Sequence, residues 1–104
     1  MIDNRQHIIG KEIPYDFEVI TVAATAIGLT ATKLKTASPP KKVIITVETA
    51  QSRYRIDGTD PTSTIGHLLN VNSSLILSGY AQLNNFKAIK TGVTSAKFVV
   101  TYLR

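Results

Sequence analysis

The segment Lys41–Ala50, with the sequence KKVIITVETA, carries the strongest strand pattern in the chain. Val43, Ile45 and Val47 are spaced two residues apart, which places their side chains on one face of a β-strand. Their β-branched side chains favour a pleated sheet over a helix. This segment therefore predicts a β-strand with a hydrophobic inner face.

The residues that follow predict a strand that turns back and pairs with this one. Gln51-Ser52 would form the hairpin tip and Arg53–Asp57 the returning strand. Tyr54 and Ile56 would then point inward, because they alternate with two arginines that share the outer face. Glu48 on the preceding strand could pair with these arginines, at a gain of well under ~1 kcal/mol.

Other segments show strand patterns separated by turn residues. They are Tyr15–Ala23, Leu29–Lys35, Ser74–Ser78, Phe86–Thr91 and Ala96–Leu103, of which Leu29–Lys35 is the weakest. About seven short strands at this spacing are typical of an all-β sandwich or barrel. The sequence thus predicts an all-β, single-domain β-sandwich of antiparallel strands over residues 15–104, with residues 1–14 as an irregular N-terminal arm.

Two connections between these strands contain hydrophobic residues. In the connector Ile65–Val71, Leu68 and Leu69 are predicted to be anchored in the core. Gly79–Asn85 is predicted to hold one helical turn, with Tyr80 and Leu83 packed inward.

The predicted strands are hydrophobic on both faces. Phe98, Val100 and Tyr102 share the expected core face of the last strand. Four hydrophobic side chains would lie opposite the core: Ile44, Ile76, Val99 and Leu103. Strands of this kind in so small a protein indicate burial by something else, such as a neighbouring subunit.

Composition excludes several classes of protein. The 104 residues contain no cysteine, so disulfides, thiolate metal sites and cysteine nucleophiles are excluded. The longest apolar run, Val19–Leu29, is shorter than the roughly 20 residues of a membrane span. The net charge of +5 would suit contact with nucleic acid, anionic lipid or an acidic protein surface.

No set of residues indicates a catalytic or metal site, so we expect a protein that is not an enzyme and binds no cofactor. His7 and His67 lack the spacing of metal ligands, and neither has a general-base pattern around it. Asp57 and Asp60 resemble the start of a calcium loop. Such a loop would need Asp or Asn at position 59 and Glu at position 68, and the chain has Thr and Leu there.

Nucleic-acid binding has the charge but lacks a stacking surface. Basic and aromatic residues are interleaved only at Arg53-Tyr54-Arg55, and alternation places the tyrosine on the face opposite both arginines. A β module that binds nucleic acid or carbohydrate is nevertheless kept as an alternative function of a different class.

The chain from Val43 to Tyr102 resembles a group of small structural proteins of tailed bacteriophage virions. The most specific part of the likeness is the run RYRIDGTDPT at Arg53–Thr62. The other matching segments are Val43–Ala50, Gly66–Leu69, Phe86–Ile89 and Thr101-Tyr102. The likeness covers about sixty of the 104 residues.

The resemblance implies a virion component that is present in many copies, assembled in the host cytoplasm and held by the major capsid protein or other virion proteins. The function that we expect is that of a capsid decoration (cement) protein, with a homo-oligomer such as a trimer as the assembly. A neck or tail ring component of the virion is the alternative. The residues expected to make protein contacts are Arg5, His7, Lys11, Arg53, Arg55, Asp57, Asp60 and His67.

Overall fold

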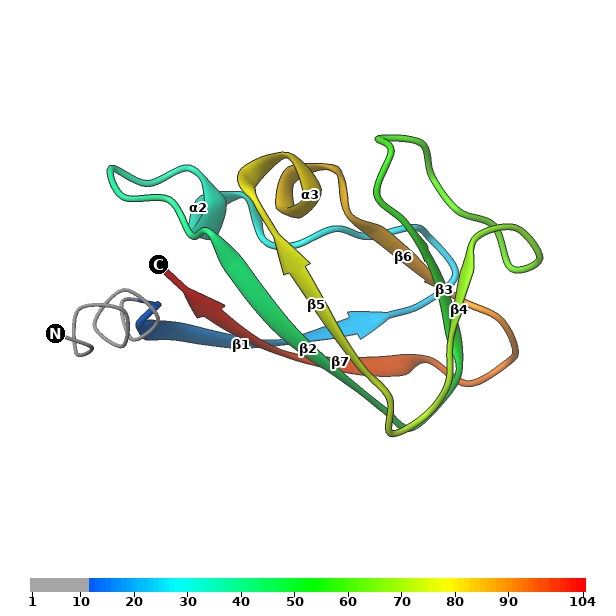
Figure 1. The fold of residues 1–104 in the computed structure, drawn as a ribbon. Helices are drawn as coiled ribbons and strands as arrows, with labels where there is room; N and C mark the ends of the chain where they lie inside the picture. The colour runs from blue at the N-terminus through cyan, green and yellow to red at the C-terminus, as the bar shows by residue number, and fades with distance from the viewer. Residues whose placement is uncertain (1–11) are drawn as a thin grey trace, which may run out of the picture.

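A computed structural model describes residues 12–104 of the chain as two packed antiparallel sheets (Figure 1). The elements are β1 (Pro14–Val22), α2 (Ala31–Leu34), β2 (Lys42–Glu48), β3 (Ser52–Arg55), β4 (His67–Leu69), β5 (Ser74–Ser78), α3 (Tyr80–Asn85), β6 (Lys87–Lys90) and β7 (Ala96–Leu103). The prediction of an all-β sandwich is confirmed. Neither helix has the length or hydrophobicity of a membrane-spanning segment in this part of the chain.

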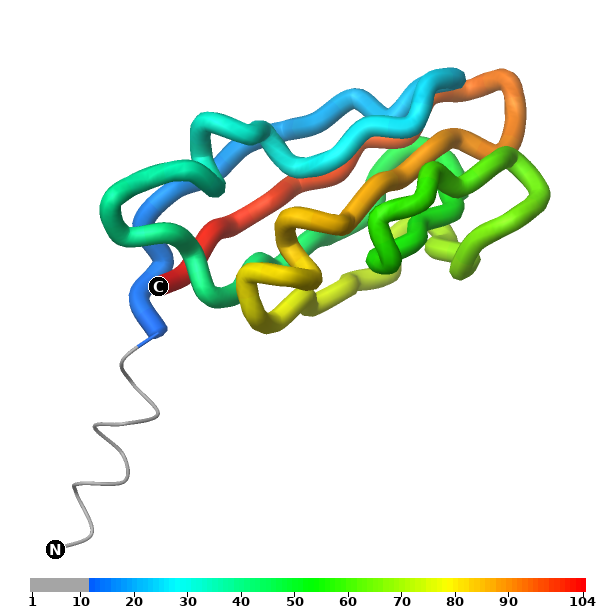
Figure 2. Tube along the Cα trace, turned by 90° about the horizontal axis from the view of Figure 1, so that it is seen from above, coloured from blue at the N-terminus to red at the C-terminus, as the bar shows by residue number. Residues whose placement is uncertain are grey.

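The larger sheet has the strand order β1-β7-β2-β5, and the smaller sheet has the order β4-β3-β6. Seen from above, β6 and the segment that follows β1 run over the larger sheet (Figure 2). The core lies between the sheets, because the predicted alternation places Val43, Ile45 and Val47 of β2 on the inner face with no exposed surface. Phe98, Val100 and Tyr102 of β7 lie beside them in the core, also as predicted.

The predicted hairpin between β2 and β3 is wrong. β2 pairs with β7 and β5, whereas β3 pairs with β4 and β6 in the other sheet. The chain leaves β2 through Thr49, whose φ is 79°, and crosses from one sheet to the other. Glu48 therefore lies opposite Lys97 of β7 and not beside the arginines of β3. Tyr54 and Ile56 pack against the core as predicted.

Three further predictions for the connections are wrong in part. The segment Leu29–Lys35 contains the short helix α2 in place of a strand. The predicted connector contains β4, where Leu69 is buried as expected but Leu68 points outward and is 45% exposed, because neighbouring strand residues face opposite ways. In α3, Leu83 is buried as predicted, whereas Tyr80 is 42% exposed and lies beside the Ala37–Lys41 loop.

One side of the sandwich is closed by backbone pairing. Ile27 and Ala88 of β6 exchange two backbone hydrogen bonds of 2.9 Å, and Lys90 N–H donates to the carbonyl of Ala23 at 3.0 Å. Gly28 is needed next to this bridge, because a Cβ there would lie 2.7 Å from the carbonyl oxygen of Phe86. The other side stays open, with β5 and β4 as the edges of the two sheets (Figure 1).

Candidate functional site

The outer face of the larger sheet is hydrophobic. We call it the outer apolar face, and its hydrophobic side chains are Phe17, Val19, Ile44, Ile76, Val99 and Leu103. Phe17 and Ile76, which lie on the two edge strands, are 56% and 58% exposed. Val99 is partly buried, and Leu103 is covered but lies outside the main core cluster. The prediction that Ile44 and Ile76 lie opposite the core is confirmed.

The strand register arranges this face in rows that cross the sheet. One row runs from Phe17 through Thr101 and Ile44 to Ile76. The next row contains Val19, Val99, Thr46 and Ser74. Cross-strand neighbours share a face, so each row is continuous from β1 to β5. The first row is hydrophobic on β1, β2 and β5, and the second is hydrophobic on β1 and β7.

The charges on this face balance. A third row contains Thr21, Lys97 and Glu48, so a cation and an anion lie side by side on β7 and β2. At the opposite end of β2, the ammonium group of Lys42 pairs with the carboxylate of Glu12 at 2.8 Å. The outward charges of the four strands thus form no region of a single sign.

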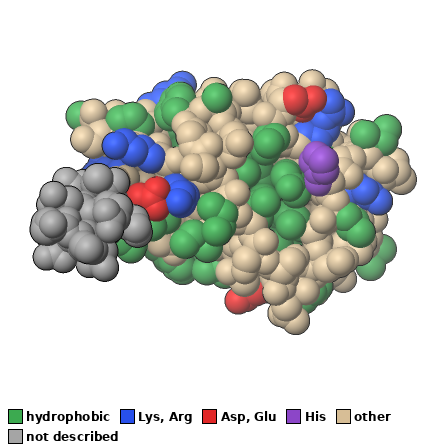
Figure 3. Space-filling model, in the orientation of Figure 1, with side chains coloured by type: hydrophobic (Ala, Val, Ile, Leu, Met, Phe, Trp, Pro, Cys, Tyr) green, Lys and Arg blue, Asp and Glu red, His purple; other side chains and the backbone are tan. Residues whose placement is uncertain are grey.

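The smaller sheet has a hollow at its end. Arg55, Ile56, Asp57, Ile65, Gly66 and His67 line this space of about 420 Å³, which we call the Arg55–His67 hollow. Three of the predicted contact residues, Arg55, Asp57 and His67, are therefore brought together. The hollow lies beside the edge strand β4, on the side where hydrophobic side chains occupy the middle of the surface (Figure 3). Ile65 contributes a side chain that is 58% exposed.

Charges inside the hollow are paired. The guanidinium group of Arg55 donates two hydrogen bonds to the carboxylate of Asp57, one of them at 3.0 Å from Nε. This pair lowers the pKa of Asp57 to about 2. The ring of His67 packs on Tyr54 with 5.2 Å between centroids. Among residues 12–104, no three His, Asp or Glu side chains lie together as metal ligands would. The hollow is thus lined by one ion pair, one imidazole ring and the isoleucines Ile56 and Ile65.

Arg53 and Asp60 hold the loop from residue 56 to residue 66, which we call the covering loop. Arg53 donates from Nε to the carbonyl of Ser63 at 3.2 Å and from Nη1 to that of Gly66 at 2.9 Å. Asp60 lies 3.7 Å from the ammonium group of Lys87 on β6. Gly66 adopts a φ of +138°, and a Cβ there would lie 3.1 Å from the carbonyl of Tyr54. These bonds place the loop on the outer face of the smaller sheet.

The remaining predicted contact residues, Arg5, His7 and Lys11, lie outside the described residues. Sequence reasoning missed Phe17 and Val19 as members of an exposed face. These two residues alternate with Asp16 and Glu18, so the sequence indicated two different faces of the strand. The alternation did not determine which of the two faces points outward.

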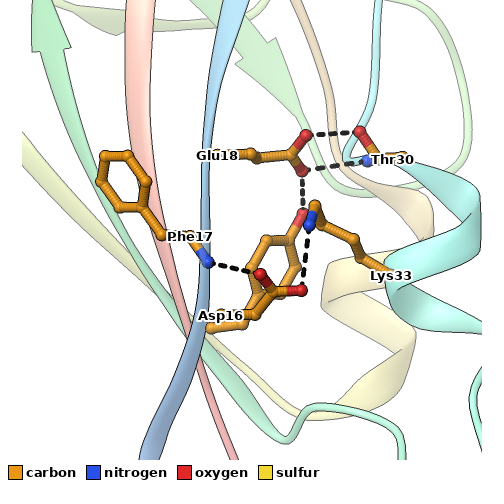
Figure 4. Close-up of polar contacts among 6 residues, drawn as sticks. Asp16, Phe17, Glu18, Thr30 and Lys33 are labelled. Carbon is orange, nitrogen blue, oxygen red and sulfur yellow. Dashed lines mark hydrogen bonds and ion pairs between the residues drawn. The ribbon is translucent and has the colours of Figure 1, made fainter.

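The inner side of β1 carries a polar cluster that ties α2 to the sheet (Figure 4). The carboxylate of Glu18 accepts hydrogen bonds from the hydroxyls of Tyr102 and Thr30. Asp16 accepts one from Lys33 at 2.9 Å, and this bond lowers the pKa of Asp16. Burial, together with the bond to Glu18, raises the pKa of Tyr102. Both carboxylates have hydrogen-bond partners within the chain, so the cluster links α2 and β7 to β1.

Comparison of the chain with protein-family models, with curated proteins and with solved structures found no match.

Proposed function

We propose that this protein is a structural virion protein that binds and stabilises a bacteriophage capsid, as a decoration (cement) protein does. The observation that carries the proposal is the larger sheet, which is hydrophobic on its inner face and again on its exposed outer face. Large exposed hydrophobic patches on small proteins mark interaction surfaces. The resemblance of Arg53–Thr62 and its neighbouring segments to tailed-phage structural proteins gives the kind of partner.

Two surfaces support binding to several neighbours at once. The outer apolar face is one of them, and the Arg55–His67 hollow with the exposed side chains of Ile65 and Leu68 is the other. Each square ångström of hydrophobic surface buried at a joint between capsid subunits contributes about 25 cal/mol. A net charge of +5 adds attraction to an acidic capsid exterior.

The first test is the copy number of the protein in purified virions, measured by quantitative mass spectrometry. A decoration protein is expected at a ratio to the major capsid protein that matches a site of the capsid lattice. Capsids that lack it should rupture at a lower temperature than complete capsids. Absence from virions, or the few copies of a single neck or tail ring, would contradict the proposal.

A second test assigns the contact surface. Ile65→Asp places a charge in the Arg55–His67 hollow, and Val93→Asp places the same charge at a side chain that is 95% exposed between β6 and β7. If the hollow binds the capsid, Ile65→Asp lowers capsid occupancy and Val93→Asp does not. Equal occupancy of both variants would exclude the hollow as the contact.

A further inference from the structure

We propose that the outer apolar face binds a second copy of this chain, giving a two-fold dimer in which the larger sheets pack face to face. The inference rests on the protein-contact role proposed above for this face, but it does not depend on a virion. It is carried by the charge balance of the face and by the order of its strands.

Charge selects this face for self-association. Two copies that each carry a net charge of +5 repel one another, and the repulsion is weakest where the local charge is zero. On the outer apolar face Lys97 lies beside Glu48, and Lys42 is paired with Glu12. By contrast, the outer face of the smaller sheet carries an excess cation, because Arg55 and Lys87 pair with Asp57 and Asp60 whereas Arg53 donates to backbone carbonyls.

The strand order makes the face complementary to itself. A two-fold axis that runs parallel to the strands between β7 and β2 exchanges β7 with β2 and β1 with β5. Each row then faces the same row of the other copy in reverse order. Lys97 faces Glu48 of the second copy, and Glu48 faces Lys97 of the second copy, because both residues lie in one row. A single operation therefore creates two ion pairs between the copies.

The same axis covers the two most exposed hydrophobic side chains of the outer apolar face. Phe17 on β1 comes to face Ile76 of the second copy on β5, and this contact occurs twice. In the free chain these residues are 56% and 58% exposed. In the middle of the row, Ile44 comes to face Thr101 of the second copy. Such an interface is isologous, which is the commonest arrangement in soluble oligomers.

The size of the face sets the expected strength. With strands about 4.8 Å apart and a rise of about 3.3 Å per residue, the face has a flat area of roughly 450 Å² per copy. Interdigitating side chains raise the surface removed from water, and the total falls near the lower end of specific interfaces, about 1,200 Å². We therefore expect a dimer that dissociates in the micromolar range.

The test is sedimentation equilibrium of the full chain from about 1 µM to about 1 mM, a range that brackets micromolar dissociation. The monomer mass is 11.3 kDa, and the average mass should rise across this range toward twice that value. Phe17→Asp and Ile76→Asp should each stay monomeric throughout, whereas Val93→Asp should dimerise like the original chain. Because both positions are exposed in the monomer, the variants are expected to fold, which circular dichroism checks.

A pair of charge variants tests the proposed axis. Lys97→Glu gives a face with two adjacent carboxylates, and Glu48→Lys gives one with two adjacent ammonium groups. Each variant alone should dimerise more weakly, because like charges then meet across the interface. An equal mixture should form the mixed dimer about tenfold more tightly than either variant dimerises alone. Native mass spectrometry with one isotope-labelled variant measures the three species.

Several results would overturn the inference. They are a chain that stays monomeric at every concentration, a dimer that tolerates Phe17→Asp, an assembly larger than two, and a statistical mixture of the charge variants. A monomer that loses capsid occupancy on Phe17→Asp would assign the face to a virion protein instead. That result would agree with the proposed function and contradict the dimer. A dimer that is absent from virions would contradict the proposed function and agree with the dimer.

Discussion

Part of the outer face of the smaller sheet lies beneath the chain's own covering loop, whereas no segment within residues 12–104 covers the outer face of the larger sheet. Arg53 holds the loop through the carbonyls of Ser63 and Gly66, and Pro61 within the loop is buried. No described segment lies in this way over Phe17, Ile44 and Ile76, which stay exposed. The two sheets therefore differ in how far the chain itself shields their outer faces from water.

The contrast between the two sheets indicates which surface a partner would cover. Eleven consecutive residues, 56 to 66, cover part of a sheet of short strands that carries Arg53, Arg55 and Lys87 on its outer face. The larger sheet, with longer strands and hydrophobic rows, receives no such cover within residues 12–104. Because burying hydrophobic surface away from water is favourable, we expect the larger sheet to bind another molecule through its outer face.

The largest change in stability is expected on the buried face of β2, and the same substitution on its exposed face serves as the comparison. Ile45→Ala should lower the free energy of unfolding by about 2–5 kcal/mol, because the side chain is fully buried and its loss leaves a cavity. Ile44→Ala, one residue away and 38% exposed, should change it by less than about 1 kcal/mol in dilute solution. Urea unfolding followed by circular dichroism measures both, since the chain has no tryptophan.

The effect of Ile44→Ala on stability should depend on protein concentration, and that of Ile45→Ala should not. At concentrations where the dimer forms, Ile44→Ala should lose stability that the original chain gains by association. Ile45→Ala should be destabilised to the same extent in dilute and concentrated samples. Equal effects of the two substitutions in dilute solution would mean that the outer face is already covered in the monomer.

An intermediate effect is expected for the covering loop. Arg53→Ala removes two hydrogen bonds from a charged donor and should cost about 1–3 kcal/mol. Arg55→Ala is the matched control, because this arginine shares the same face but, among residues 12–104, pairs with the exposed Asp57 alone, and its loss should cost less. Hydrogen exchange at residues 57–65 should rise in the Arg53 variant alone. Unchanged exchange there would show that Arg53 does not hold the loop.

The sequence predicted the core because local alternation determines it. The β-branched pattern of β2 and the aromatic pattern of β7 each specify a buried face without reference to any other segment. The pairing of β2 with β5 and β7 depends on partners far along the chain, so a two-residue gap at Gln51-Ser52 gave the wrong hairpin. β4 is only three residues long, which is too short for a periodic pattern.

The site was predictable in its residue types but not in its arrangement. Arg53 and Arg55 both stood out as basic residues on one face, yet one holds a loop and the other lines the hollow. That distinction depends on where the carbonyls of Ser63 and Gly66 lie, and these residues are 10 and 13 positions along the chain from Arg53. Alternation also left open which face of β1 points outward, because Asp16 and Glu18 occupy the inner one with α2 above them.

The smallest change in stability is expected from the ion pair between Asp57 and Arg55 at the covering loop, and it should depend on pH. Hydrogen bonds from Arg55 lower the pKa of Asp57 from 3.8 to about 2, so the folded chain releases this proton more readily than the unfolded chain. The resulting stabilisation is fully present above about pH 4 and is lost as the pH falls through the folded value. Asp57→Asn should therefore be less stable than the original chain at pH 5 and equal to it near pH 2. Because the carboxylate is exposed, the difference should be small and should shrink in high salt.

Ile44→Ala on the outer apolar face should leave the pH dependence unchanged, and urea midpoints at the two pH values compare the three proteins. If Asp57→Asn keeps the full acid dependence, the bond to Arg55 does not stabilise the fold, and Asp16 beside Lys33 becomes the group to test.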